Sequence, residues 1–212
     1  MQEKQKEFEK KLREQQQIEA QLSNEIQKII EEEVRKSRER ALEKARQTAK
    51  QTGKPAVKPG VSTTYEMTPE EKLASGQFEQ NKRHLPWPVE RGVITDHFGT
   101  HDHPVLKNIV VRNNGVDIST VQGAKARAVF AGEVSRVFVV TGGNTAVIIR
   151  HGKYLTVYSN LINVQVKSGE KVAIKQTIGT IGTDSDDAAK TVLKFQIWKE
   201  NEKLNPEDWI SR

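Results

Sequence analysis

The chain has 212 residues, of which 35% are hydrophobic, and its 34 basic and 28 acidic side chains give a net charge of +6. The absence of cysteine excludes a disulfide scaffold and thiol chemistry, and no apolar run is long enough for a transmembrane helix. Basic and acidic residues are mixed along the chain, which disfavours nucleic-acid binding. Because hydrophobic content is low for one globular domain, we expect a compact domain joined to an extended polar arm.

Residues 1–52 contain neither glycine nor proline and consist mainly of good helix formers, so they predict one long helix. Its apolar residues recur mostly every fourth position and form a narrow stripe: Phe8, Leu12, Ile18, Leu22, Ile26, Ile30, Val34, Ala41, Ala45 and Ala49. A stripe of this kind needs a partner helix, so we predict a coiled coil, folded back or self-associated. A solvated single helix is the alternative. The charged start lacks the apolar core of a signal peptide, and we expect a fragment of a longer protein.

Residues 53–85 are predicted to be a linker that contains one short helix. Gly53 and Pro55 end the first helix. The run Thr68-Pro69-Glu70-Glu71 predicts a new helix start, with threonine as the N-cap, proline at the first position and glutamate at the third.

The rest of the chain predicts a mainly antiparallel β domain over residues 86–212, which makes the whole an α+β protein. Valine- and isoleucine-rich segments alternate with glycine turns at intervals of about ten residues. The expected strands are 126–130, 133–140, 145–150, 154–159, 164–166, 172–175 and 192–198.

Three short motifs in this domain resemble the metal-binding motifs of the LytM/lysostaphin-type zinc endopeptidases. In the first, Asn113-x-Gly115-x-Asp117 matches H-x-G-x-D with asparagine in place of the histidine. In the second, which runs from Tyr158 to Leu161, Asn160 stands where that family has a catalytic histidine. In the third, Val192 and Lys194 take both histidine positions of H-x-H-F-E, and Gln196 replaces the glutamate.

The framework around these motifs also resembles the family, through Ala131-Gly132-Glu133-Val134 and the strand that follows Gly143-Asn144. The resemblance covers about residues 86–212 and implies a degenerate LytM domain of the duplicated hybrid motif type, without zinc or another cofactor. The entry Leu85-Pro86-Trp87-Pro88 after a helical region resembles the EnvC-type murein hydrolase activators. A remaining Asp117 carboxylate needs another partner, and Lys194 and Arg112 are the candidates.

This resemblance implies a non-enzymatic activator of peptidoglycan hydrolysis at cell division, in the periplasm or cell envelope. The former peptidase groove would bind the autoinhibitory helix of an N-acetylmuramyl-L-alanine amidase. Its candidate residues are the former active-site positions Arg112, Asn113, Asp117, Tyr158, Asn160, Val192, Lys194 and Gln196. A helix from the chain's own N-terminal part, at 68–82 or 40–50, would fill the groove in a self-inhibited state, and the coiled coil would contact a membrane division complex.

Three alternatives remain at this point. One is an envelope scaffold or peptidoglycan-binding module. Another is an atypical zinc endopeptidase, in which Asp117 would recruit ligands from among His97, His101, His103 and His151. The third concerns only residues 68–82, which would cover a hydrophobic edge of the domain rather than regulate it.

Overall fold

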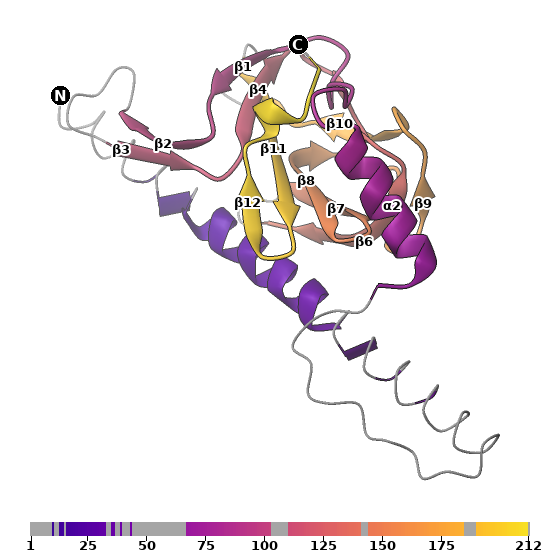
Figure 1. The fold of residues 1–212 in the computed structure, drawn as a ribbon. Helices are drawn as coiled ribbons and strands as arrows, with labels where there is room; N and C mark the ends of the chain where they lie inside the picture. Colours follow the sequence, from indigo (N-terminus) through magenta and orange to yellow (C-terminus); the bar gives the residue numbers. More distant parts are fainter. Residues whose placement is uncertain are drawn as a thin grey trace, which may run out of the picture.

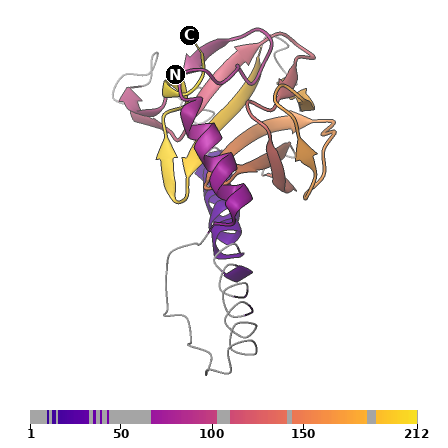
Figure 2. The same cartoon turned by 45° about the vertical axis from the view of Figure 1, so that its right-hand side comes forward.

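The computed structural model describes residues 10, 13–14, 16–32, 35–36, 39, 43, 67–102, 110–140, 144–184 and 190–211. A large antiparallel sheet forms the body of the domain, and two helices lie against it at different places (Figures 1 and 2). In the described part of the chain, no helix is long and apolar enough to cross a membrane.

The strands of this sheet lie between residues 93 and 204. Its main path runs β1 (Val93–Asp96), β4 (Val116–Thr120), β11 (Thr191–Lys199), β8 (Tyr154–Ile162), β7 (Thr145–His151), β6 (Gly132–Val139) and β9 (Lys171–Val172). Three more strands join it: β10 (Thr177–Ile181) pairs with β8 and with β5 (Lys125–Arg127), and β12 (Glu202–Leu204) pairs with β11. A separate hairpin consists of β2 (Gly99–Asp102) and β3 (Val110–Asn113).

The predicted antiparallel β domain is confirmed, with two differences in its strands. Residues 164–166 are not a strand, although the Gln165 N–H donates to the carbonyl of Ile178 at 2.9 Å. Strands β1 to β4, β10 and β12 were not predicted, because segments of three to five residues are too short to show a clear alternation. These unpredicted strands carry part of the site described below.

Alternation along β11 separates the two faces of the sheet. Leu193, Phe195 and Ile197 are fully buried in the main core, which a second row of residues from β4, β8 and β10 completes. Lys194, Gln196 and Trp198 project to the opposite face, because successive side chains of a strand alternate. Because the side chains of β11 alternate, this strand contributes one row to the core and one row to the surface that carries the site.

Helix α2 (Pro69–Gln80) begins as predicted, with Thr68 as the N-cap. The Glu71 N–H donates to the Thr68 hydroxyl, and the Thr68 N–H donates to the Glu71 carboxylate, which completes a capping box. The helix buries Phe78, whose ring centroid lies 4.9 Å from those of His151 and Tyr154. Segment 68–82 thus covers a hydrophobic edge of the domain, away from the former active-site positions.

The helix at residues 16–32 packs against the sheet and not against another helix. Its buried residues Leu22, Ile26 and Ile29 contact a surface that we call the docking face. The docking face consists of Val140, Ala146, Ile148, Leu155, Val157 and Trp198. The predicted coiled coil is not seen in the described residues, because the sheet of the same chain buries the apolar stripe. Most of the remainder of segment 1–52, including all of 40–50 except residue 43, lies outside the described residues.

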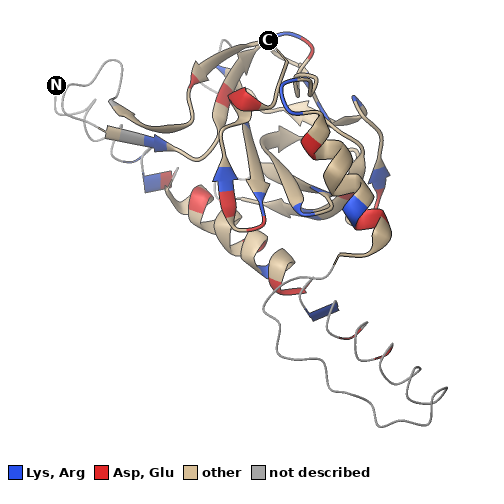
Figure 3. Ribbon diagram, viewed as in Figure 1, with Lys and Arg blue, Asp and Glu red and all other residues tan. Residues whose placement is uncertain are grey.

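Ion pairs add to the apolar contact at the end of this helix. The Arg136 guanidinium on β6 donates to Glu32 and lies 3.9 Å from the Glu25 carboxylate. Figure 3 shows that basic and acidic residues are interspersed over the described parts of the helix and the domain. Full burial of an aliphatic side chain is worth about 1.5–3 kcal/mol, so Leu22, Ile26 and Ile29 dominate the attachment and partly exposed pairs add less.

His151 is a buried structural residue of β7. Its Nδ1 lies 2.7 Å from the Ala131 carbonyl and its Nε2 lies 2.9 Å from the Thr156 hydroxyl. Because a carbonyl can only accept, Nδ1 carries the proton and Nε2 accepts from the hydroxyl. Burial lowers the pKa of His151 to about 4, against the smaller opposing effect of the bond to Ala131.

We predict that this histidine makes the domain sensitive to mild acid. The folded pKa is about 4 and the ordinary value is 6.5, so only the unfolded state takes up a proton between these values. Stability is therefore complete above pH 6.5 and falls, by on the order of 3 kcal/mol, as the pH drops towards 4. Urea unfolding of His151→Gln across this range is expected to show a smaller loss than unfolding of the unsubstituted chain. The exposed His84, changed to Gln, is the matched control and is expected to leave the profile unchanged.

Candidate functional site

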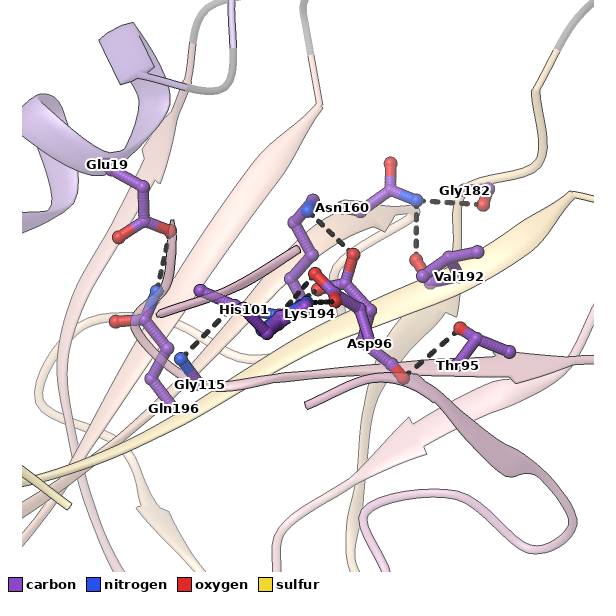
Figure 4. Close-up of polar contacts among 12 residues, drawn as sticks. Glu19, Thr95, Asp96, His101, Gly115, Asn160, Gly182, Val192, Lys194 and Gln196 are labelled. Atoms are coloured by element: carbon purple, nitrogen blue, oxygen red, sulfur yellow. Dashed lines mark hydrogen bonds and ion pairs between the residues drawn. The ribbon is translucent and has the colours of Figure 1, made fainter. Parts of the chain in front are cut away.

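Three neighbouring strands bring the first group of site residues together. Asp117 on β4 is the register partner of Asp96 on β1 and of Lys194 on β11. Asn113 ends β3, four residues before Asp117, and His101 lies on β2. The sheet register therefore places two carboxylates and an ammonium at one place, and hydrogen bonds bring the Asn113 amide to the carboxylates. Figure 4 shows Asp96, His101 and Lys194 at this place.

The Asn113 side chain is 5% exposed and its polar atoms are satisfied within the site. Its Nδ2 donates to Asp96 Oδ2 at 3.0 Å and to Asp117 Oδ1 at 3.3 Å, while its Oδ1 accepts from the Gly115 N–H at 3.0 Å. The second oxygen of Asp96 lies 2.6 Å from His101 Nε2. Asparagine suits this position because one amide can donate to two carboxylates and accept from the backbone at the same time.

Lys194 neutralises the carboxylate that Asn113 shares. Its Nζ lies 2.9 Å from Asp117 Oδ2, and the two side chains are 26% and 17% exposed. Burial opposes the charge on Lys194, but the negative charges of Asp117, Glu19 and Asp96 outweigh it, so the pKa of Lys194 is raised. The expected pairing of Asp117 with Lys194 is therefore present, whereas Arg112 is exposed on β3.

These residues do not fit a zinc ion. A catalytic zinc site uses about three nitrogen, sulfur or carboxylate ligands, and here an amide and an ammonium stand beside the one carboxylate of the motif. The Lys194 ammonium already contacts Asp117 Oδ2, and it repels a dication. Within the described ranges, no group of three or more His, Cys, Asp or Glu side chains is placed to hold a metal ion.

The histidines proposed as alternative ligands have other contacts. His97 pairs with Glu207 at 3.0 Å on the surface, His101 contacts Asp96, and His151 is in the core. His103 lies outside the described residues.

Gly115 keeps β4 and β11 close behind the site. A Cβ built on Gly115 would lie 2.1 Å from the carbonyl oxygen of Phe195, which real contacts do not allow. The glycine of the motif is thus required by the approach of the β11 backbone, whether or not a metal is bound.

Asn160 has a structural role at the end of β8. Its Nδ2 donates to the carbonyls of Val192 and Gly182, at 2.7 and 3.0 Å, and its Oδ1 accepts from the Asn144 amide. Its φ of 68° lies in the left-handed region, which asparagine tolerates better than most residues. The side chain at this position therefore joins β8 to the start of β11.

Two other predicted groove residues take different positions. Tyr158 is fully buried, its ring lies 5.3 Å from that of Phe195, and its hydroxyl accepts from the Val129 N–H. It belongs to the main core and does not line a groove, because alternation on β8 turns it inward. Val192 is half-buried and contributes its carbonyl to Asn160.

Gln196 contacts the helix at residues 16–32. Its Nε2 donates to Glu19 Oε1 at 2.8 Å (Figure 4). Asn114 Nδ2 donates to Glu19 Oε2 at 2.5 Å. Sequence reasoning missed Glu19, Asn114 and Asp96. Glu19 lies three residues before Leu22, on the side of the helix that carries the apolar stripe, and this spacing is the one signal that could have found it.

Comparison with known proteins agrees with this geometry. Residues 111–206 match the model of peptidase family M23. This part of the chain is therefore similar to M23 peptidase domains. The chain is 27% identical over 154 residues to the murein hydrolase activator EnvC of Escherichia coli K12, which covers 71% of this chain and 35% of EnvC. It is 29% identical over 126 residues to the murein hydrolase activator NlpD of the same organism, covering 57% of this chain and 29% of NlpD.

A solved structure shows the same fold. Helicobacter pylori Csd3 matches 60% of this chain and 35% of its own chain, with a TM-score of 0.51 and 27% identity. The resemblance to LytM-domain proteins of the EnvC and NlpD type is therefore confirmed. The chain spans about a third of the length of the curated relatives named above.

We predict that Asn160 stabilises the domain through both its amide and its backbone conformation. Changing Asn160 to Ala removes the bonds to Gly182 and Val192 and places alanine at a φ of 68°, so we expect a loss of about 2–3 kcal/mol. Asn160→Gly loses the same bonds without the unfavourable φ and is expected to recover about 1 kcal/mol. Urea unfolding measures both, and equal stability of all three chains would contradict this role.

We also predict that two substitutions restore a zinc site. Asn113→His with Lys194→His, together with Asp117, would give the three ligands of a catalytic zinc site and remove the repelling ammonium. Metal analysis of the purified double variant is expected to find about one zinc ion per chain. Adding Asp117→Ala is expected to abolish that binding. An unsubstituted chain with as much zinc as the double variant would show that Lys194 does not exclude the metal.

Proposed function

We propose that this chain activates a peptidoglycan amidase and does not itself cleave peptidoglycan. The observation that carries the proposal is the Lys194–Asp117 ion pair at the former metal position, beside a face of the same strand that holds a helix. A site with a fixed ammonium has no means of activating a metal-bound water. The neighbouring apolar surface is suited to binding an amphipathic helix.

The names of EnvC and NlpD support the activating role. By the same resemblance we place the protein in the bacterial periplasm or envelope, where murein lies. The occupant of the docking face in the active state would be the autoinhibitory helix of an N-acetylmuramyl-L-alanine amidase. Binding to that helix would favour the open form of the amidase, because an activator can shift an equilibrium only by preferring one of its states.

The helix at residues 16–32 would act as a self-inhibitor in this scheme. It buries Leu22, Ile26 and Ile29 on the docking face, so a second helix could not use these contacts at the same time. We assign to this segment the inhibitory role that was expected of residues 68–82 or 40–50. The part of the arm beyond it would contact a membrane division complex, whose movement would withdraw the helix.

An envelope scaffold is the second candidate function. The contacts that favour it are the lysine–aromatic pairs on the domain, in which Lys82 lies over Trp209 and Lys203 over Trp198 at 5.5 and 5.0 Å. Surfaces of this kind can hold an anionic polymer without any effect on a hydrolase.

We predict that releasing the helix increases amidase activation. Ile26 is 1% exposed, and Ile26→Asp would place a charge against the docking face, which disfavours docking strongly. With a cognate amidase and purified peptidoglycan, we expect the variant to raise dye-labelled fragment release about tenfold or more over the unsubstituted chain.

The matched control is Asn24→Asp, which adds the same side chain on the exposed side of the helix and is expected to change nothing. If neither chain activates any cognate amidase but both bind peptidoglycan, the scaffold function is favoured. Peptidoglycan cleavage by the chain alone would contradict the non-enzymatic role.

A further inference from the structure

One end of the docking face holds a carboxylate in a more specific way than apolar contact requires. Both oxygens of Glu19 accept hydrogen bonds, one from Gln196 at 2.8 Å and one from Asn114 at 2.5 Å. The two donors are 2% and 9% exposed, so they form a built site rather than a surface contact. Glu19 is thus bound as a ligand would be.

The orientation of the Gln196 amide is fixed by a neighbour. The Trp198 indole Nε1 donates to Gln196 Oε1 at 2.9 Å. Because an indole N–H can only donate, Gln196 must present its Nε2 hydrogens towards Glu19. The Gln196 amide can therefore bind only a hydrogen-bond acceptor, and a carboxylate has one acceptor oxygen for Gln196 and one for Asn114.

Positive charge surrounds the same point. Lys194 and Lys203 both interact favourably with the charge of Glu19, and Arg112 lies close enough to Lys203 to repel it. Lys194 is already neutralised by Asp117, but Lys203 lies over the Trp198 ring at the edge of the docking face. An anion here is favoured by these charges and by hydrogen bonds that charge strengthens.

We propose that Asn114 and Gln196 form a carboxylate subsite, and that the partner helix that replaces residues 16–32 must bring an aspartate or glutamate to it. This inference rests on the proposed function and specifies the chemistry of its partner. The partner carries its acidic residue three positions before the first of its fully buried apolar residues, as Glu19 precedes Leu22.

The other end of the docking face extends this pattern. Arg136 contacts Glu25 and Glu32, the latter thirteen residues after Glu19 and about 20 Å away along a helix. Two acidic residues about 20 Å apart, one at each end of an apolar stripe, would fix the register of the helix along the docking face. Apolar contact alone would allow it to slide by a turn.

A peptide-binding experiment tests the subsite in the full chain. The receptor is the Ile26→Asp chain, whose own helix is displaced, and the probe is a fluorescent peptide of residues 16–32, followed by anisotropy. We expect Glu19→Gln in the peptide to weaken binding about tenfold or more, since hydrogen bonds to a charged group are stronger than hydrogen bonds between neutral groups. Glu31→Gln, at an exposed position of the same helix, is the control and is expected to bind normally.

A reciprocal substitution separates the subsite from a general loss of packing. Gln196→Glu keeps an acceptor for Trp198 but replaces the donor with a negative charge, and thermal unfolding checks that the domain remains folded. On this receptor the preference is expected to reverse, with the Glu19→Gln peptide binding better than the original. Equal binding of both peptides to both receptors would overturn the proposal.

The amidase assay distinguishes this inference from the function on which it rests. We expect Gln196→Glu, added to Ile26→Asp, to reduce amidase activation about tenfold or more. Undiminished activation would show that the partner brings no carboxylate here, and the proposed function would stand without the subsite. If the peptide preference reverses but neither chain activates an amidase, the proposed function fails and the subsite remains as the anchor of the chain's own helix.

Discussion

The ion pair between Lys194 and Asp117 is the contact on which the arrangement of the site depends. It joins β4 to β11 at a register position and neutralises the carboxylate that the Asn113 amide also contacts. In a protein that binds a metal ion at this position, the cation could dissociate into solvent. Here it is a side chain fixed to the sheet, so the charge balance of the site is part of the fold.

The same strand connects that pair to the docking face. Lys194, Gln196 and Trp198 follow one another on one face of β11, which carries in turn the ion pair, the amide bound to Glu19, and an apolar wall. The ion pair and the surface that holds the helix are therefore adjacent on one strand. The period of two along a strand gives both without any change in the core, where Leu193, Phe195 and Ile197 alternate with them.

The two helices show why apolar pattern alone does not reveal the role of a segment. Helix α2 is short and weakly amphipathic, yet Phe78 inserts among four aromatic rings and makes the helix part of the domain. The helix at 16–32 carries the longer stripe and lies on the outer face, where its removal would leave the main core intact. The number of apolar residues in each helix does not predict which helix joins the main core and which lies on the outer face. The position of the surface that each helix contacts determines this difference.

From the sequence alone, the β domain, the start of α2 and the substitution of the motif histidines could be predicted, since each follows from local pattern or from residues at fixed spacing. The pairing of Asp117 with Lys194 was one of two options, and only the register of β4 with β11 selected it. Tyr158 was assigned to a groove but lies in the core, because the inward or outward direction of a side chain depends on which face of β8 is covered. The contacts of Glu19 with Asn114 and Gln196 join positions more than 90 residues apart, at separations of 95 and 177 residues. No local pattern carries such information, because long-range contacts exist only once the sheet has formed and offers a face to the helix.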